Sequence, residues 1–286
     1  MEPKQVDPVE FRAGQRQQWN QGASGWRKWS DLIDSVAGAV SERLVELAGV
    51  ETGSRVLDVA AGYGEPSLTA ARAAGPDGSV VATDISAEML AFGRERAEAA
   101  GLENVEFVES DALSLDFPEG SFDAALSRWG IIFEPDGEAA AARVRGFLKP
   151  GARMAISSWG PPERVPFLAI PMRTAMQRLD VPPPPPGTPG PLSRPTQEAL
   201  AGLLEGGGFS DVEVEEITVT IEWRSPEEFT TFVREIAPPI RAMIDPHPQE
   251  AQDETWAAIT DAIRREASDD GAVRLANLSL LASGRA

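Results

Sequence analysis

The sequence predicts an α/β fold in which an open, mostly parallel β-sheet is covered by helices on both faces. Two observations lead to this class. Between residues 55 and 160, five short apolar runs alternate with segments of helical periodicity, which is typical of parallel strands joined by crossover helices. The chain has 286 residues and 42% of them are apolar, so it is long enough to bury a full core.

The first fifty residues are predicted to be helical. Residues 1–29 are polar with spaced aromatic side chains, and we expect one or two short helices there that need another surface to pack against. From 30 to 49, apolar residues recur every three or four positions, which predicts an amphipathic helix that ends at Gly49. The aromatic residues of the first segment are Phe11, Trp19, Trp26 and Trp29.

Residues 55–160 carry the first five predicted strands. Ser86 is suited to cap the helix after the second strand, and the proline and glycine of LKPGA (148–152) predict a sharp turn. The strands are expected at 56–59, 80–83, 104–108, 122–126 and 154–159. The helices between them are expected at 67–75, 86–101 and 136–147.

Beyond Trp159 the pattern becomes less regular. A proline-bounded helical piece is expected at 161–180, and the five prolines at 182–186 predict either a stiff spacer or a surface loop. Alternating residues at 212–223 predict a strand. The other elements expected here are a helix at 196–209, helices near 226–236 and 250–267, and a closing strand at 273–286, which brings the sheet to seven strands.

These elements divide the chain into four predicted parts. They are an N-terminal helical cap (1–29), a ligand-binding core (30–160), a helical lid with the proline-rich loop (161–195), and the C-terminal part of the core with inserted helices (196–286). The aromatic residues of the cap and the methionines of the lid suit a cover over an apolar or aromatic small molecule, unless they only pack against each other.

Composition limits the partners. The 45 acidic and 26 basic residues give a net charge of −19, which repels nucleic acid and anionic membrane surfaces, although this acidity also suits a general role in solubility. Cysteine is absent, so thiolate nucleophiles and cysteine metal sites are excluded, and we expect no metal. The N-terminus lacks an apolar signal core and no run of about 18 apolar residues occurs, so we expect a cytoplasmic protein without stable membrane insertion. We expect it to be a monomer or homodimer.

The stretch RVLDVAAGYGEPS (55–67) resembles a nucleotide-binding loop with an added carboxylate. Gly62 and Gly64 permit a tight turn close to a ligand, but Glu65 would repel a pyrophosphate, and the third small residue of a dinucleotide loop is missing. Asp58, inside the apolar strand, is costly to bury unless it faces a cation or a hydrogen-bond donor. A cationic adenosyl ligand, S-adenosylmethionine, removes both objections.

Two further carboxylates follow later strands. Asp84 ends the second strand and is placed to accept both hydroxyls of an adenosine ribose. Asp111 follows the third strand, where it can accept a hydrogen bond from the adenine amino group. Carboxyl ends of parallel strands meet at one edge of the sheet, so these groups are expected to converge.

Four segments in order also resemble the motifs of class I S-adenosylmethionine-dependent methyltransferases, especially the branch similar to ubiquinone/menaquinone-biosynthesis enzymes, over about residues 40–160. They are VLDVAAGYGEPS, VVATDISAEML, VEFVESDALSLDFPEGSFDAALSRWGIIF and LKPGARMAISSWG. The resemblance implies a Rossmann-like sheet and S-adenosyl-L-methionine as cofactor. It implies these cofactor-binding residues: Asp58, Ala60, Gly62, Gly64, Asp84, Ile85, Met89, Asp111, Ala112 and Ser127. The chain departs from the commoner motif at Ala61, often cysteine, and at Tyr63, often threonine or proline.

The implied reaction is methyl transfer to O, C or N of a small, apolar or aromatic metabolite. Such a displacement needs alignment and exclusion of water, and it needs no nucleophile or metal. His247, the single histidine, is a candidate base if the acceptor must lose a proton, or else an exposed residue of a proline-flanked loop. The candidate substrate contacts are Tyr63, Trp19, Arg128 and Trp129, each of which also suits a purely structural role. A nicotinamide-dependent oxidoreductase and a non-catalytic S-adenosylmethionine-binding module remain as alternatives.

Overall fold

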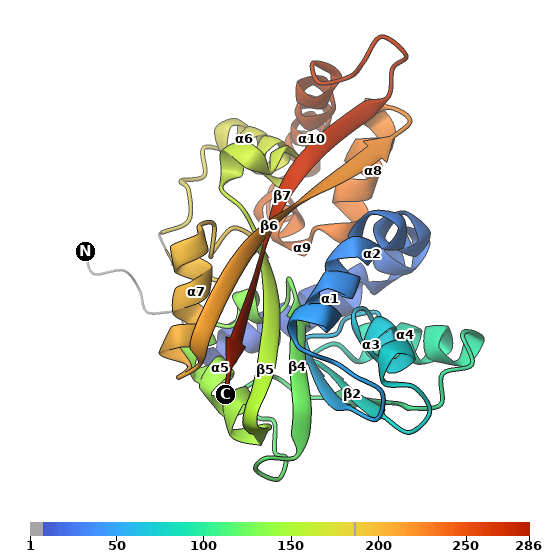
Figure 1. The fold of residues 1–286 in the computed structure, drawn as a ribbon. Coiled ribbons are helices and arrows are strands. Elements are labelled where there is room, and N and C mark those ends of the chain that lie inside the picture. Colours follow the sequence, from blue (N-terminus) through green and yellow to red (C-terminus); the bar gives the residue numbers. More distant parts are fainter. Residues whose placement is uncertain (1–7, 186) are drawn as a thin grey trace.

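A computed structural model describes residues 8–185 and 187–286 of the chain (Figure 1). It contains one seven-stranded sheet with the order β3-β2-β1-β4-β5-β7-β6. The pairs from β3 to β5 are parallel, and β7 runs antiparallel between β5 and β6. The strands are β1 (Arg55–Val59), β2 (Ser79–Asp84), β3 (Val105–Glu109), β4 (Phe122–Arg128), β5 (Leu148–Trp159), β6 (Ser210–Trp223) and β7 (Val273–Arg285). The predicted doubly wound, mostly parallel α/β fold is confirmed.

The two faces of the sheet bury separate apolar clusters because successive strand residues point to opposite sides. Val56 belongs to the cluster under α2, α3 and α4, whereas its neighbour Leu57 belongs to the cluster under α5 and α7. The helices are α1 (Pro8–Lys28), α2 (Ser30–Leu47), α3 (Ser67–Ala74), α4 (Ala87–Ala99), α5 (Gly137–Phe147), α6 (Pro166–Leu179), α7 (Gln197–Gly206), α8 (Pro226–Ile236), α9 (Pro238–Ile244) and α10 (Gln249–Arg264), with short 3₁₀ turns at η1 (Ile131–Phe133) and η2 (Pro162–Arg164).

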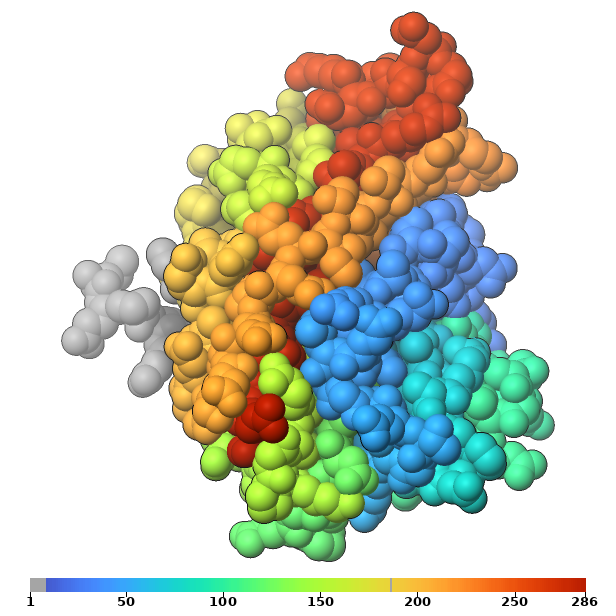
Figure 2. All heavy atoms as spheres, in the orientation of Figure 1, coloured from blue at the N-terminus to red at the C-terminus, as the bar shows by residue number. Residues whose placement is uncertain are grey.

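A group of helices covers one end of the sheet. The long strands β6 and β7 extend beyond their neighbours, and α6, α8 and α10 gather around this extension (Figure 1). Helix α1 joins this group by packing against α4, α8 and α9. The N-terminal helices fill the space between β6 and the half of the molecule that contains α3 and α4 (Figure 2). None of the helices in the described ranges is long and apolar enough to cross a membrane.

Four local predictions need correction. The cap forms one helix of 21 residues from residue 8, longer than the one or two short helices expected. Residues 1–7 lie outside the described residues, as does Pro186 of the proline run. Strand β5 starts at Leu148, which pairs with Phe122 of β4, and not at Met154 as predicted. The sharp bend predicted in LKPGA lies inside this strand, where the register shifts between the pairs Phe122–Leu148 and Ala124–Arg153 and Gly151 has φ +82°. Strand β4 continues to Arg128, and α9 was not predicted at all. The two strand boundaries depend on pairing between β4 and β5, which are remote from each other in sequence.

Candidate active site

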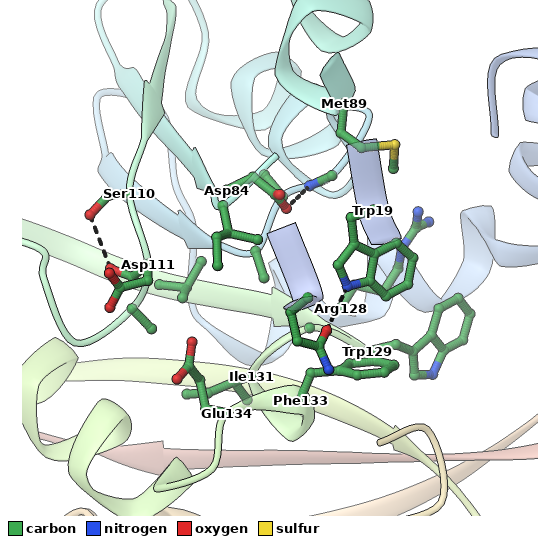
Figure 3. Close-up of a pocket in the computed structure, with 18 of the residues that line it drawn as sticks. Trp19, Asp84, Met89, Ser110, Asp111, Arg128, Trp129, Ile131, Phe133 and Glu134 are labelled. Atoms are coloured by element: carbon green, nitrogen blue, oxygen red, sulfur yellow. Dashed lines mark hydrogen bonds between the residues drawn. The ribbon is translucent and has the colours of Figure 1, made fainter. Parts of the chain in front are cut away.

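The carboxyl ends of β1, β2, β3 and β4 meet at one edge of the sheet, and the strand order reverses between β1 and β4. A cavity of about 120 Å³ lies here, which we call the strand-end cavity (Figure 3). Its walls come from the loops after these strands, from α4 and from α1. They include Ala60, Gly62, Tyr63, Asp84, Ile85, Met89, Asp111, Ala112, Arg128, Trp129 and Glu134, together with Phe11, Arg12, Gln15, Trp19 and Trp26 of α1.

The loop after β1 is shaped by its glycines. Gly62 has φ +56°, and a Cβ at this position would lie 3.3 Å from Cε of Met89. Gly64 has φ +103°, and its Cβ would lie 3.3 Å from Cα of Gly93 in α4. Positive φ is strained for residues with a side chain, so these two positions favour glycine. The loop can therefore pass close to α4 while its backbone lines the cavity.

Asp84 is the best placed acceptor in the cavity. Its Oδ2 accepts a hydrogen bond from the N–H of Gly62 at 2.8 Å, and its Oδ1 accepts one from the N–H of Ser86 at 2.8 Å. Each carboxylate oxygen keeps a second acceptor site, so Asp84 can also receive two hydroxyl groups from a ligand. Burial raises the pKa of Asp84 to about 6.

Asp58 lies behind the loop and does not line the cavity. Its Oδ2 accepts a hydrogen bond from Oγ of Ser67 at 2.5 Å, while Oδ1 has no hydrogen-bond partner among the described residues. Burial raises the pKa of Asp58 to about 7, although the Ser67 hydroxyl and the positive charge of Arg128 oppose this rise. Asp58 is therefore placed to hold the loop and α3 rather than to touch a ligand directly.

Arg128 supplies a buried positive charge at the wall of the cavity. Its Nη1 donates to Oγ of Ser41 at 2.8 Å and its Nη2 donates to Oη of Tyr63 at 3.0 Å. Tyr63 in turn donates to Asp34 of α2 at 2.9 Å, and burial raises its pKa to about 12, so the phenol is neutral. Within the described ranges, no carboxylate oxygen lies within 4.0 Å of Arg128. Asp34, Glu65 and Asp58 act on Arg128 only through their charge at longer range, so its guanidinium is placed to bind an anion directly.

The end of β4 turns sharply beneath the cavity. Trp129 has φ 52°, a strained value for a tryptophan, and its N–H donates to Oγ of Ser157 at 3.0 Å. Oγ of Ser127 accepts the N–H of Ile131 at 2.9 Å, so Ser127 supports the turn from below. A Cβ on Gly130 would lie 2.5 Å from Cβ of Ala60, which shows how tightly the ends of β1 and β4 pack.

A second, apolar cavity of about 110 Å³ adjoins the first. The two share the aromatic walls Trp19, Trp26, Trp129 and Phe133. The rest of its lining comes from α2, α6, α8, α9 and β6, and includes Ile33, Val36, Phe167, Leu168, Ile221 and Phe232. Trp159 stacks on Trp129 with ring centroids 4.3 Å apart and extends the aromatic wall.

The predicted site residues fall into two groups. Eleven positions line the strand-end cavity: Ala60, Gly62, Asp84, Ile85, Met89, Asp111 and Ala112 of the predicted cofactor set, and Tyr63, Trp19, Arg128 and Trp129 of the predicted substrate set. Asp58, Gly64 and Ser127 lie outside its lining, and His247 lies in the loop between α9 and α10, where it lines neither cavity. The structure therefore gives no support to His247 as the base.

Several lining residues were not predicted. Arg12 and Gln15 lie on the same face of α1 as Trp19, and this face is visible in the sequence once residues 8–28 are taken as one helix. Glu134, just after η1, was also missed, although it closes an apolar run after the fourth strand. Across residues 8–185 and 187–286, no cluster of three or more His, Asp or Glu side chains is arranged to hold a metal ion.

Comparison with known proteins identifies the family. A family model described as a methyltransferase domain matches residues 56–151. A ubiquinone/menaquinone biosynthesis C-methyltransferase from Teredinibacter turnerae is 31% identical over 195 residues, which cover 63% of this chain and 78% of the relative.

Solved structures show the same fold. YcgJ from Bacillus subtilis has a TM-score of 0.54 at 20% identity, covering 86% of this chain and 98% of that one. Phosphoethanolamine N-methyltransferase 2 from Haemonchus contortus has a TM-score of 0.57 at 20% identity, covering 99% of this chain and 61% of that one. The sequence match to the Teredinibacter protein displaces the nicotinamide-dependent alternative. The chain therefore belongs to the class I S-adenosylmethionine-dependent methyltransferases, with S-adenosylmethionine as its cofactor.

Proposed function

We propose that the protein methylates a neutral aromatic or otherwise apolar small molecule, which binds in the apolar cavity. One observation carries this proposal: the apolar cavity adjoins the strand-end cavity across shared walls, Trp19, Trp26, Trp129 and Phe133. A methyl donor in one cavity and an acceptor in the other would then meet at these aromatic side chains. Carbon is the acceptor atom that the name of the Teredinibacter relative favours, and O and N are the other candidates.

The residues that line the strand-end cavity suit the two ends of the cofactor. Asp84 is placed to accept the ribose hydroxyls, with Ile85 and Met89 against the adenosine. At the other end, the guanidinium of Arg128, which is held by Ser41 and Tyr63, suits the carboxylate of the methionine moiety. The backbone of Gly62 passes between these two ends. When bound, the cofactor supplies an electrophilic methyl carbon on a sulfonium sulfur.

The apolar cavity offers carbon surface rather than hydrogen bonds. The indole N–H of Trp26 donates to the carbonyl of Ile236 at 3.1 Å, that of Trp129 to Oγ of Ser279 at 3.0 Å, and that of Trp19 to Gln15 at 2.9 Å. Because these three indole N–H groups already donate within the protein, they add little to the binding free energy of a methyl acceptor. Large aromatic walls instead favour a flat apolar body.

The protein contributes alignment and exclusion of water. Helix α1 covers the strand-end cavity, and Asn20 ties it to α4 by accepting a hydrogen bond from Oγ of Ser86 at 2.6 Å. No titratable side chain is found in the described lining of the apolar cavity. The acceptor must therefore be nucleophilic without help from a base on that side. Holding such an acceptor in line with the methyl group lowers the barrier, because the two reacting groups no longer have to find each other in solution.

Introducing a polar side chain into the apolar cavity tests whether the methyl acceptor is apolar. Leu168 of α6 lines only the apolar cavity, and Leu168→Asn would bury an amide that lacks a partner, at a cost of about 1–3 kcal/mol. We expect the KM of an aromatic acceptor to rise about tenfold, with the Kd of S-adenosylhomocysteine unchanged. Transfer of labelled methyl groups to a panel of phenols, quinols and polar amines measures the KM of each acceptor. Calorimetry measures the Kd of S-adenosylhomocysteine.

Leu168→Met is the matched control, because it keeps an apolar side chain of similar volume and should leave both constants within about threefold. A preference of the wild type for charged polar acceptors would contradict the proposed acceptor class. Binding of S-adenosylhomocysteine without turnover of any acceptor would favour the non-catalytic binding module instead.

The pKa of Asp84 predicts how cofactor affinity depends on pH. Only the ionised carboxylate can accept the ribose hydroxyls together with two backbone N–H groups, and its pKa is about 6. Affinity should therefore be constant above pH 7 and fall about tenfold for each pH unit below 6, because binding then requires release of a proton. Calorimetric titration of S-adenosylhomocysteine between pH 5 and 8 measures this slope. An affinity of the wild type that does not change with pH would contradict this prediction. The Asp84→Asn variant should show no pH dependence of affinity in this range.

A further inference from the structure

Glu134 is an unexplained acidic residue in the wall of the strand-end cavity. It follows η1 directly, and its Oε2 is buried without a hydrogen-bond partner among the described residues. A buried polar atom without a partner is costly in a folded protein. Such an atom in the wall of a ligand cavity indicates a donor that arrives with the ligand.

Asp111, on the opposite wall, faces the same end of the cavity (Figure 3). Its Oδ1 accepts the N–H groups of Leu113 at 3.1 Å and Ser114 at 3.0 Å, which fix the orientation of the carboxylate. The pKa of Glu134 is raised by burial and by the negative charge of Asp111, while Arg12 of α1 opposes the rise. The negative charge of Asp111 thus acts on Glu134, and a ligand group with donors between the two carboxylates would relieve this repulsion.

The position of this pair indicates which part of the cofactor it meets. With the ribose on Asp84 of β2, the base extends toward β3, the strand that Asp111 follows. We propose that Asp111 and Glu134 each accept one hydrogen of the adenine 6-amino group, which makes Glu134 a specificity-determining residue for an unsubstituted 6-amino purine. This inference rests on the proposed function, because it uses the same orientation of the cofactor.

The proposal predicts strong discrimination at one atom. A 6-oxo purine would place an acceptor oxygen against two carboxylates, and sites built to hydrogen-bond a ligand reject analogues that lack the required group. We expect the wild type to bind S-inosylhomocysteine at least about 100-fold more weakly than S-adenosylhomocysteine. An N6-methyl group removes one of the two hydrogens, and this analogue should bind at least about tenfold more weakly.

Calorimetry with these three ligands on the wild type and on Glu134→Gln tests the proposal. The glutamine oxygen can still accept from the 6-amino group, and its NH₂ can now donate to a 6-oxo group. The affinity for S-adenosylhomocysteine should stay within about fivefold of wild type, whereas discrimination against the inosyl ligand should fall to about tenfold or less. Glu119→Gln makes the same change of charge at an exposed position and should alter neither value.

The outcomes separate this inference from the proposed function. If the wild type binds none of the three ligands, the orientation of the cofactor itself is wrong. Two other outcomes would contradict the role of Glu134 while leaving the proposed function intact. In the first, the wild type binds S-adenosylhomocysteine and S-inosylhomocysteine equally well. In the second, Glu134→Gln discriminates between these two ligands as strongly as the wild type does.

Discussion

Asp84→Asn should raise the Kd of S-adenosylhomocysteine by about 100-fold to 1,000-fold. Both oxygens of Asp84 already accept backbone N–H groups, from Gly62 and from Ser86, each at 2.8 Å. An asparagine has one acceptor oxygen, so its NH₂ group must face one of these N–H donors. The variant loses a charged bond to the ribose and a bond that holds the loop, and bonds to charged groups contribute roughly 1.5–3 kcal/mol each.

Asp123→Asn is the matched control for this prediction. Asp123 is also a strand aspartate, in β4, and it accepts the N–H of Arg55 at 2.9 Å while pairing with Lys149. It does not line the strand-end cavity. Calorimetry should therefore find wild-type affinity in this variant. If Asp84→Asn binds within threefold of wild type, Asp84 does not hold the ribose.

Gly25→Ala should lower the free energy of unfolding by about 1–3 kcal/mol, the range for overpacked sites. A Cβ on Gly25 would lie 2.2 Å from the carbonyl oxygen of Glu235 and 2.7 Å from its carbonyl carbon. These are backbone atoms of α8, which cannot move aside as a flexible side chain would. Helix α1 must therefore shift, and it carries Trp19 and Trp26 into both cavities. We expect cofactor affinity to fall about tenfold in the same variant.

Gly14→Ala, on the same helix, provides the control. A Cβ on Gly14 would meet no atom of the described residues within 4 Å, so this change should raise the free energy of unfolding by about 0.5–1 kcal/mol through helix propensity. Urea unfolding measures stability, and titration with S-adenosylhomocysteine measures affinity. Equal effects of the two substitutions would mean that the contact between α1 and α8 does not determine the position of α1.

The core of the fold could be predicted because its signals are local. Short apolar strands separated by helices permit few arrangements other than a parallel sheet, and glycines and aspartates at the strand ends then converge at one edge. Asp84 and Asp111 reach the cavity for this reason. The start of β5 at Leu148 was misjudged because it depends on pairing with Phe122 of β4, and the short helix α9 was missed.

Which side chains reach a ligand was less predictable. Asp58 and Arg128 lie on adjacent strands, and the sequence predicted Asp58 as a cofactor-binding residue and Arg128 as a substrate contact. Asp58 instead bonds to Ser67 behind the loop, while Arg128 lines the cavity. Only tertiary packing decides which of the two side chains reaches the cavity, because the spacing of residues along the chain does not specify how deeply a side chain is buried beneath a loop. His247 shows the same limit, since a single histidine is conspicuous in a sequence wherever the chain places it.

The sequence by itself determined the fold class, the cofactor and the strand ends that form its site, because strand periodicity and turn residues act over a few neighbouring positions. The tertiary structure alone decided that α1 covers the site, that an apolar cavity adjoins it, and that Arg128 is joined to Ser41 and Tyr63. Arg128 is separated from these two partners by 87 and 65 residues. Contacts at such separations arise from the packing of whole elements, and local sequence patterns do not specify that packing.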